Sequence, residues 1–537
     1  MRQLLGLALA ATCALSATVF TAPTGSPALE IPLNGRPPLH ARTAPTHQAP
    51  ISVNPATQRL VDGEGREVFF HGANVVVKGF PWAPETANWT PDTSFSRRDW
   101  ALFEEMGLNA IRLGTMWPGA EPVRGQYNQS YLGLVAGIVR NASDYGIYSL
   151  LDMHQDVMSE KFCGEGVPLW AAQPNVSNFP FPVDKPYVNK SASDVPTAAE
   201  CAQRAWAEYY FTEATATAFQ NLYTNANGLL DAWAGFWAEV ARTVVAHGLN
   251  GAVLGYELIN EPFAGDVFAQ PDLIVPGVAD AKLLQPAYEV LQRAIRAVDT
   301  AHALFFEGVT WDWFNVGFTE VPGGAQWRNK SVLSYHLYFP MPDFSLPVQY
   351  WARQEDMRRL QCGGFLTEFG IQKCNGCGDV QPTVIMDAAD EHKQSWLYWE
   401  YKPFVGYKTG HSSSFWLPNG TLDIAMAKTI SRTYPLAVAG HVVNMSFNVS
   451  TQPDGTNAVF RLSYVTDPNV RSAVTEIYCN DALHYPNGRT VSYTASAGSV
   501  QLKVNTSVVN RVFVEVSPFP PPAGVTVWVD VYGTPSA

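Results

Sequence analysis

Residues 253–262, with the sequence VLGYELINEP, join a short apolar run to polar side chains at its end. Val253–Ile259 has the length and the composition of a buried β-strand. Asn260, Glu261 and Pro262 follow it directly. In a barrel of eight parallel strands, the functional side chains lie at the carboxyl ends of the strands. The stretch therefore predicts a barrel strand that places Asn260 and Glu261 at the mouth of such a barrel.

Seven further runs of strand length alternate with amphipathic helical patterns, which predicts a (β/α)8 barrel. A doubly wound sheet is the alternative, but nothing in that fold favours a count of eight. The other predicted strands are Val68–Val76, Ala110–Leu113, Tyr148–Met153, Leu304–Glu307, Val332–Tyr338, Gly364–Phe369 and Ser395–Trp399. The predicted helices include Arg97–Met106, Tyr131–Tyr145, Gly235–His247, Ala287–Val298 and Val348–Leu360.

The predicted fold class is α/β, a (β/α)8 TIM barrel followed by a small C-terminal β-sandwich. We assign residues 51–434 of the 537 to the barrel and residues 435–537 to the sandwich. Six alternating runs, separated by turn residues, support the sandwich: Val442–Val449, Ala458–Val465, Val474–Cys479, Ser499–Val504, Val512–Val516 and Val525–Val531. We expect the sandwich to pack against the barrel rather than to act as a separate sugar-binding module. Ser159–Asn225 is too long for a simple loop and predicts an insertion that lines a cleft.

The N-terminus is typical of a secreted protein. Residues 1–22 carry Arg2, an apolar run and small residues, which predicts a signal peptide, and residues 23–50 form a Pro-rich flexible leader. Ten Asn-x-Ser/Thr sequons agree with the secretory route. We therefore predict a secreted or extracellular protein, or one in the lumen of an acidic secretory-pathway compartment. The sequons begin at Asn88, Asn128, Asn141, Asn175, Asn189, Asn329, Asn419, Asn444, Asn448 and Asn505.

Six cysteines follow the predicted signal peptide, and an even number in an oxidising compartment suggests disulfides. Six cysteines allow 15 pairings, among which the sequence does not choose. For the Cys374-Asn-Gly-Cys377 pair we favour a structural bridge over a redox or metal motif. The other four are Cys163, Cys201, Cys362 and Cys479.

The net charge of −13, from 35 basic and 48 acidic residues, argues against a nucleic acid or an anionic membrane held by charge. The polar residues gather instead at predicted strand ends. Glu261 and Glu368 are 107 residues apart, so only a closed fold brings them together. Such a pair suits a retaining glycosidase, in which one carboxyl is the acid and the other the nucleophile. Arg112 is positioned to keep Glu368 ionised, and Asn260 to donate to a sugar 2-hydroxyl.

Each of these residues also has a simpler interpretation. A lone Glu after a strand is usually solvated or caps a helix, and His154 or His336 alone is most often a structural histidine. Asp152, His154 and Asp156 are not a recognisable set of metal ligands. The gathering of such groups at six of the eight predicted strand ends favours a catalytic site.

The motifs at these ends resemble glycoside hydrolase family 5. They are Asn260-Glu261-Pro262, His336-x-Tyr338 and Glu368; residues 151–156 (LDMHQD), 255–262 (GYELINEP) and 364–370 (GFLTEFG) are similar to the endoglycoceramidases of that family. The resemblance covers residues 53–434 and the trailing sandwich. It implies retaining cleavage of the β-glycosidic bond between a glycan and ceramide, with Glu261 as acid/base and Glu368 as nucleophile. It also implies a sugar subsite of Arg112, His154, Asn260, His336, Tyr338 and Trp399, with Lys78 and Asp156 as contacts to sugar hydroxyls.

The resemblance implies a glycolipid substrate, transient contact with lipid surfaces, a monomer, and no cofactor, metal or nucleic acid. Two other functions stay open: a family 5 β-glucosidase or glucanase acting on sterol glucosides, other β-glucosides or β-glucans, and a non-catalytic barrel that binds sugar or lipid. A lipid aglycone needs an apolar groove, so we expect an exposed apolar patch beside Glu261. Its candidate members are Val157, Met158, Phe162, Val167, Leu169, Trp170, Phe263, Val267, Phe268, Leu273 and Ile274.

Overall fold

The computed structural model describes residues 50–187, 194–310, 314–338, 342–371, 382–404, 414–417, 419–450 and 457–534. The predicted signal peptide, nearly all of the leader and the Cys374–Cys377 pair lie outside these residues. No helix among the described residues is long and apolar enough to cross a membrane.

The core of the molecule is a closed barrel of eight parallel strands, as predicted. Their residues are buried throughout, apart from the partly buried His336, because they are short apolar runs with helices packed outside them. In barrel order the strands are β4 (His71–Val75), β5 (Ala110–Gly114), β6 (Tyr148–Asp152), β7 (Val253–Glu257), β8 (Ala303–Glu307), β9 (Ser331–Leu337), β10 (Gly363–Phe369) and β11 (Ser395–Tyr398). All eight predicted strands are confirmed, and their ends coincide with the prediction or differ from it by at most three residues.

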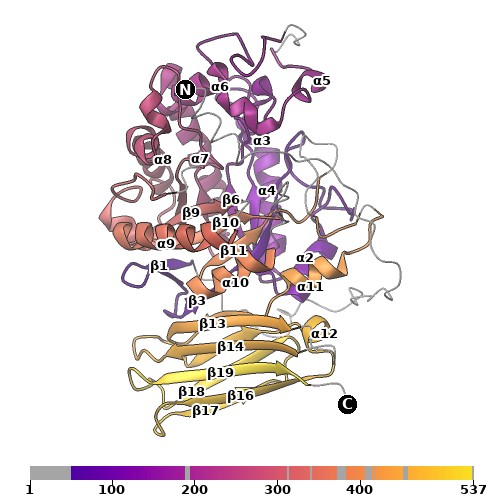
Figure 1. Ribbon diagram of the computed structural model, residues 1–537, viewed down its shortest axis with the longest axis vertical. Helices are drawn as coiled ribbons and strands as arrows, with labels where there is room; N and C mark the ends of the chain where they lie inside the picture. The colour runs from indigo at the N-terminus through magenta and orange to yellow at the C-terminus, as the bar shows by residue number, and fades with distance from the viewer. Residues whose placement is uncertain are drawn as a thin grey trace.

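Helices surround this barrel (Figure 1). The predicted helices are confirmed, and several begin earlier than the sequence pattern indicates. The principal ones are α2 (Arg97–Met106), α4 (Gln129–Ser143), α7 (Leu229–Ala246), α8 (Gln285–Arg296), α9 (Pro342–Leu360), α10 (Pro382–His392) and α11 (Ile424–Ile430).

The N-terminal strands do not stand in the barrel. Strands β1 (Ser52–Asn54), β2 (Arg59–Val61) and β3 (Glu67–Val68) extend a C-terminal sheet through the pair β3 and β12 (Tyr434–Val438). The predicted boundary at residue 51 assigns this segment to the barrel, whereas its backbone pairs with the sandwich. The side chains of the segment nevertheless belong to the barrel's core, because they pack in one cluster with barrel-strand residues, including Phe305 and Phe365, and with Ala437 of β12.

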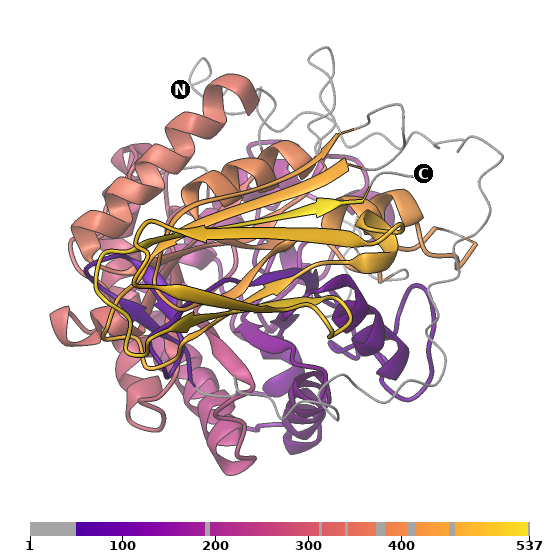
Figure 2. The same cartoon turned by 90° about the horizontal axis from the view of Figure 1, so that it is seen from below.

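The sandwich is formed by this sheet and a second one. The first has the order β1-β2-β3-β12-β15-β18-β17, in which β15 is Val474–Tyr478, β17 is Gln501–Asn505 and β18 is Arg511–Ser517. The second has the order β13-β14-β19-β16, namely His441–Ser450, Asn457–Val465, Thr526–Gly533 and Arg489–Ala495. The sandwich packs against the barrel, as expected, and lies across the lower end of the barrel (Figures 1 and 2). Strand β16 was not predicted from the sequence, because its residues do not alternate between buried apolar and exposed polar side chains.

The insertion after β6 lies at the opposite end of the barrel from the sandwich (Figure 1). It contains α5 (Ala198–Cys201) and α6 (Glu213–Tyr223), and a disulfide joins Cys163 to Cys201. Cys362 and Cys479 are buried free thiols. The expectation that the cysteines pair is therefore confirmed for the insertion and wrong for these two.

Candidate active site

Glu261 and Glu368 meet at the carboxyl end of the barrel. One carboxylate oxygen of each, together with a ring nitrogen of His336, lies within 4.8 Å of the others. Retaining glycosidases hold their two carboxyl groups about 5–5.5 Å apart, whereas inverting enzymes leave about 6.5–9.5 Å for a water. The separation therefore fits the retaining geometry.

Two donors hold the Glu368 carboxylate. Arg112, fully buried on β5, donates from Nη1 to Glu368 Oε2 at 2.9 Å. The hydroxyl of Tyr338 donates to Oε1 at 2.8 Å. Charge-assisted bonds of this kind bind the ionised carboxyl, which is the form that attacks a sugar carbon. The contact predicted between Arg112 and Glu368 is present.

Arg112 also joins Glu368 to neighbouring strands. Its guanidinium pairs with Asp152 at 3.2 Å and with Glu257, and it donates to Asn260 Oδ1 at 2.7 Å and Asn74 Oδ1 at 3.1 Å. Burial alone would lower the pKa of Arg112, but the surrounding carboxylates raise it above its usual value. Four strands are thereby fixed around one cation.

Glu261 has the electrostatic surroundings of an acid. Burial, with the charge of Asp156, raises the pKa of Glu261 to about 7. His336 Nδ1 lies 2.9 Å from Glu261 Oε1, and burial lowers the pKa of His336 to about 4. The imidazole is therefore neutral at neutral pH and places no positive charge beside the acid. Glu261 can hold a proton near pH 7 and release it, as an acid/base must.

Glu307, at the end of β8, is a site residue that the sequence analysis overlooked. Its Oε2 accepts a hydrogen bond from the backbone N–H of Glu261 at 2.8 Å, and its Oε1 lies 3.7 Å from His336 Nδ1. Glu261 has φ of +43°, a left-handed backbone that a non-glycine residue adopts only when its surroundings enforce it. Burial and the nearby Glu261 raise the pKa of Glu307 well above its usual value. The sequence feature that could have indicated Glu307 is its position as a glutamate at the end of an apolar strand.

The predicted sugar-contacting residues lie beside this pair. The rings of His154 and Trp399 are stacked, with centroids 5.3 Å apart. The Lys78 ammonium lies 4.5 Å from the Trp399 ring centroid and pairs with Asp156. Burial would lower the pKa of His154, but Asp152, bonded to its Nδ1 at 2.8 Å, helps to raise it to about 9. Aromatic and charged groups thus share one buried surface.

Asn260 is held at both ends of its amide. Its Oδ1 accepts from Arg112, and its Nδ2 donates to the backbone oxygen of Gln155 at 2.8 Å. Gln155 in turn donates to the backbone oxygens of Asn260 and Glu261 at 2.7 and 3.0 Å. The structure therefore brings all ten predicted site residues to one end of the barrel, and it adds Asn74, Gln155, Glu257 and Glu307.

Among the described residues, three trios offer metal-ligand atoms within 4.8 Å of one another, and two of them share His336: His154 with Asp156 and Glu165, Glu257 with Glu307 and His336, and Glu261 with His336 and Glu368. In the first, the Lys78 ammonium already lies against both carboxyl groups. The other two contain His336, whose Nδ1 lies 2.9 Å from a Glu261 oxygen and 3.7 Å from a Glu307 oxygen.

The apolar patch expected beside Glu261 is wrong in its composition. Of its candidates only Ile274 is exposed, at 49%, and the rest are buried or partly buried. Phe263, for example, packs on Tyr210, Phe211 and Phe219 of the insertion. These residues attach the long loops to the barrel, because packing between loop and barrel removes more of their surface from water than a groove would.

Exposed aromatics at this end come from other positions. Trp206, 42% exposed, packs edge-on against Tyr210, whose ring stacks on Phe263. Gln155, which donates to the backbone oxygen of Glu261, also donates to the Tyr210 hydroxyl at 3.4 Å. Trp206 is therefore two contacts away from the residues that hold Glu261.

Comparison with known proteins agrees with this geometry. The family model described as Cellulase (glycosyl hydrolase family 5) matches residues 61–405, and that of the glycoside hydrolase family 5 C-terminal domain matches residues 432–519. The solved structure of endo-glycoceramidase II from Rhodococcus sp. has the same fold, with a TM-score of 0.65 and 24% identity over 88% of this chain and 99% of that one.

Two curated relatives are much more similar in sequence. A protein named endoglycoceramidase from Cyanea nozakii is 49% identical over 447 residues, which cover 82% of this chain and 86% of the relative. Another of that name from Hydra vulgaris is 49% identical over 439 residues, covering 82% of each chain. Both domains, the paired glutamates and these relatives agree, and the chain belongs to glycoside hydrolase family 5.

Proposed function

We propose that the protein hydrolyses the β-glycosidic bond between a glycan and a ceramide aglycone, with retention of configuration. The observation that carries the chemistry is the carboxylate pair, with Glu261 protonated near pH 7 and Glu368 held by Arg112 and Tyr338. The aglycone rests on the two 49% identical relatives named endoglycoceramidase.

The reaction is a double displacement. In the first step Glu368 attacks the anomeric carbon while the carboxyl proton of Glu261 moves to the departing glycosidic oxygen, which releases ceramide and leaves a glycosyl ester on Glu368. In the second step the Glu261 carboxylate takes a proton from water, whose oxygen attacks the anomeric carbon and frees Glu368. Asn260 donates to the sugar 2-hydroxyl, and Trp399 with His154 supports the sugar ring.

The lipid chains need an apolar surface outside the barrel mouth, since each CH₂ left in water forfeits about 0.8 kcal/mol. We assign this role to exposed aromatics of the mouth, foremost Trp206. Such residues also suit transient contact with a lipid surface, and a monomer suffices for the reaction because both glutamates come from one chain.

A substrate panel tests the function. Glucosyl-ceramide, lactosyl-ceramide, a sterol glucoside and cello-oligosaccharides are incubated with the enzyme, and the products are separated by chromatography. We expect free glycan and intact ceramide from the ceramide glycosides, with the β anomer seen first by proton NMR. Faster cleavage of the sterol glucoside or the cello-oligosaccharides would contradict ceramide as the aglycone. An α anomer as the first product would exclude retention of configuration.

We also propose that the chain enters the secretory route, on the basis of residues 1–22, the sequons and the Cys163–Cys201 disulfide in the insertion. Expression in a eukaryotic cell should deliver the protein to the medium or to an acidic organelle lumen. Enzymatic removal of N-glycans should then lower its mass, and a cytosolic protein with unchanged mass would contradict this.

A further inference from the structure

Residues 164–166, Gly-Glu-Gly, lie against residues 154–157, just beyond the end of β6. The backbone N–H of Asp156 donates to the backbone oxygen of Glu165 at 3.1 Å, and the backbone N–H of Glu165 donates to the backbone oxygen of Asp156 at 2.8 Å. A Cβ on Gly164 would lie 1.9 Å from the backbone oxygen of Asp156. Gly166 has φ of +107°, and a Cβ there would lie 2.3 Å from the backbone oxygen of His154. Glycine on both sides thus allows an approach that places Glu165 beside the predicted sugar contacts.

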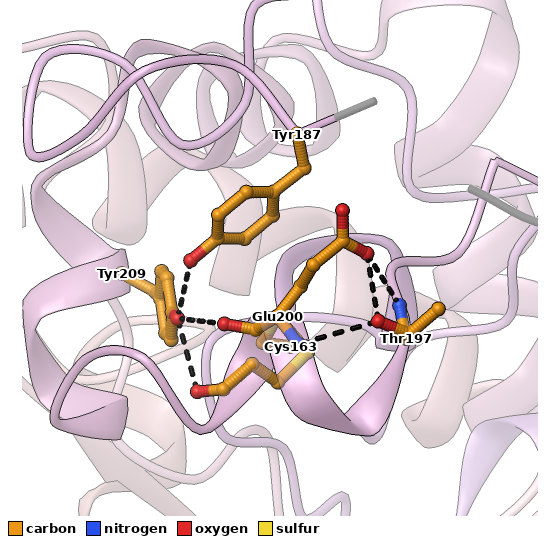
Figure 3. Close-up of a disulfide and its surroundings, with 6 residues drawn as sticks. Cys163, Tyr187, Thr197, Glu200 and Tyr209 are labelled. Carbon is orange, nitrogen blue, oxygen red and sulfur yellow. Dashed lines mark hydrogen bonds between the residues drawn. A yellow bond between two sulfur atoms is a disulfide. The ribbon is translucent and has the colours of Figure 1, made fainter. Parts of the chain in front are cut away.

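The insertion anchors this loop. Cys163, two residues before Glu165, is bonded to Cys201 at the end of α5. The Tyr209 hydroxyl donates to the backbone oxygen of Cys201 at 3.0 Å. It also bonds the Tyr187 hydroxyl at 2.9 Å (Figure 3). Glu165 is therefore held from the strand end on one side and from the insertion on the other.

The carboxyl of Glu165 is buried at 4% exposure and points toward Lys78. Its Oε1 lies 3.7 Å from Lys78 Nζ and accepts no hydrogen bond from the described residues. A buried oxygen in this state is unfavourable, because it has lost its hydrogen bonds to water without replacing them. One ligand atom each of Glu165, Asp156 and His154 lie within 4.8 Å of one another. The open hydrogen-bonding position thus lies among the groups already assigned to sugar binding.

The two neighbouring carboxyl groups differ in charge. Burial and the Asp156 charge raise the pKa of Glu165 well above its usual value. For Asp156, burial acts in the same direction, but Lys78 and His154 outweigh it and lower the pKa. A hydrogen bond between the two side chains also raises the pKa of Glu165 and lowers that of Asp156. The neutral acid thus donates to Asp156, while its unpartnered Oε1 remains as an acceptor for a sugar hydroxyl.

We propose that Glu165 is a specificity-determining residue of the sugar site, where its carboxyl forms a hydrogen bond with one hydroxyl of the glycan that lies against Lys78, Asp156 and Trp399. The inference rests on the proposed function in one respect, that a glycan occupies this site, and it is independent of the aglycone. The competing occupant of the open position is a structural water, which would bind without regard to the glycan.

Calorimetric binding of lipid-free ligands separates these two cases. The ligands are the non-cleavable phenyl 1-thio-β-glucoside and 1-thio-β-lactoside, with analogues that each lack one hydroxyl. The proteins are the wild type, Glu165→Leu, Glu165→Gln and, as a matched control in the same loop, Glu160→Gln at a partly exposed position. Thermal unfolding of each variant verifies its folding.

We expect Glu165→Leu to weaken binding of the parent ligand about 10- to 100-fold, the range of a hydrogen bond worth about 1.5–3 kcal/mol. For one deoxy analogue the wild type and Glu165→Leu should bind equally, because the hydroxyl in question is already absent. Glu165→Gln, which keeps a donor and an acceptor, should recover part of the loss, and Glu160→Gln should bind as the wild type does.

A loss of the same size for every analogue, or no loss, would overturn the assignment and leave a structural water or a packing role. Since the ligands carry no lipid, preference for another aglycone in the substrate panel would leave this result standing. A wild type that binds none of the thioglycosides would overturn both the assignment and the proposed glycosidase.

Discussion

Glu368 is buried and Glu261 is partly buried, and their partners differ in charge. Glu368 accepts from the Arg112 guanidinium and the Tyr338 hydroxyl, whereas Glu261 contacts the neutral ring of His336. Neighbours of this kind separate an acid from a nucleophile among two residues of the same type. The roles that we propose for the two glutamates therefore depend on their partners from other strands rather than on the glutamates themselves.

Removal of either carboxyl should abolish turnover without unfolding. Glu261→Gln and Glu368→Gln should each reduce kcat on ceramide glycosides by several orders of magnitude, with the melting temperature near that of the wild type. Azide should rescue Glu368→Gly on an activated glycoside and yield the inverted α-glycosyl azide, because azide fills the space of the carboxylate. Near-native activity in either glutamine variant would remove that residue from the mechanism.

The raised pKa of Glu261 sets a basic limit to activity. The carboxyl must be protonated to donate to the leaving oxygen, so kcat/KM for a phenyl β-glycoside should fall about tenfold per pH unit above pH 7. A dinitrophenyl glycoside, whose leaving group needs no proton, serves as the control and should lose this limb. The same limb with both substrates would assign it to another group.

At the scale of elements, the insertion between β6 and α7 brings Glu165 beside Asp156, His154 and Lys78. Its disulfide closes a loop with a sequence separation of 38, which contributes about 2–4 kcal/mol to stability. The paired substitution Cys163→Ser and Cys201→Ser should lower the melting temperature and raise KM for aryl glycosides, because the 164–166 loop loses an anchor. Substitution of the buried free thiol Cys362 by Ala controls for cysteine loss and should leave KM unchanged.

The same insertion carries the surface that we assign to the aglycone. Trp206→Ser should raise KM for ceramide glycosides more than for a soluble aryl glucoside, since only the former has chains to bury. Trp528→Ser is a matched control, because Trp528 is also 42% exposed but belongs to β19 in the sandwich, at the other end of the molecule. Equal losses of Trp206→Ser on both substrates would exclude it from lipid binding.

At the scale of the whole molecule, barrel and sandwich share their contact region. His71 of β4 is stacked between Trp396 of the barrel and Tyr434 of the sandwich, with centroids 4.2 and 3.7 Å away. Tyr434 also donates to the Gly107 oxygen at 2.7 Å. Strands β1–β3 reach from the barrel's lower end into the sandwich sheet. The two units are thus coupled, so we expect one cooperative unfolding transition.

His71 should make this junction sensitive to acid. Neither ring nitrogen has a hydrogen-bond partner among the described residues, and burial, with the Arg432 charge, lowers the pKa of His71 well below 6.5. The unfolded chain then binds more protons below pH 6.5, so this contribution to stability is complete above that pH and is lost as the pH falls. His71→Phe keeps the stacking and removes the titration. Its melting temperature should fall less than that of the wild type between pH 7 and pH 5, and parallel curves would exclude His71 from the effect.

Much of the site was accessible from sequence because its residues follow strands that are themselves local apolar runs. Once eight such runs form a barrel, their polar ends must meet, which is how Glu261, Glu368 and Arg112 were found together. Glu307 and Glu165 were missed for different reasons. Glu307 ends a strand as the other site residues do, but the sequence alone gave it no role in the site. Glu165 reaches the site only because the backbone of a long loop lies close to residues 154–156.

The sequence by itself determined the eight strands, their helices, the C-terminal sandwich and the two glutamates, because each depends on a local pattern of apolar and polar residues. The tertiary structure alone decided which sheet receives residues 52–68, which cysteines pair, and that Phe263 and its neighbours are core rather than groove. These depend on pairing and burial between segments far apart in the chain. A residue's own type does not reveal whether its apolar surface meets the barrel, a lipid or water.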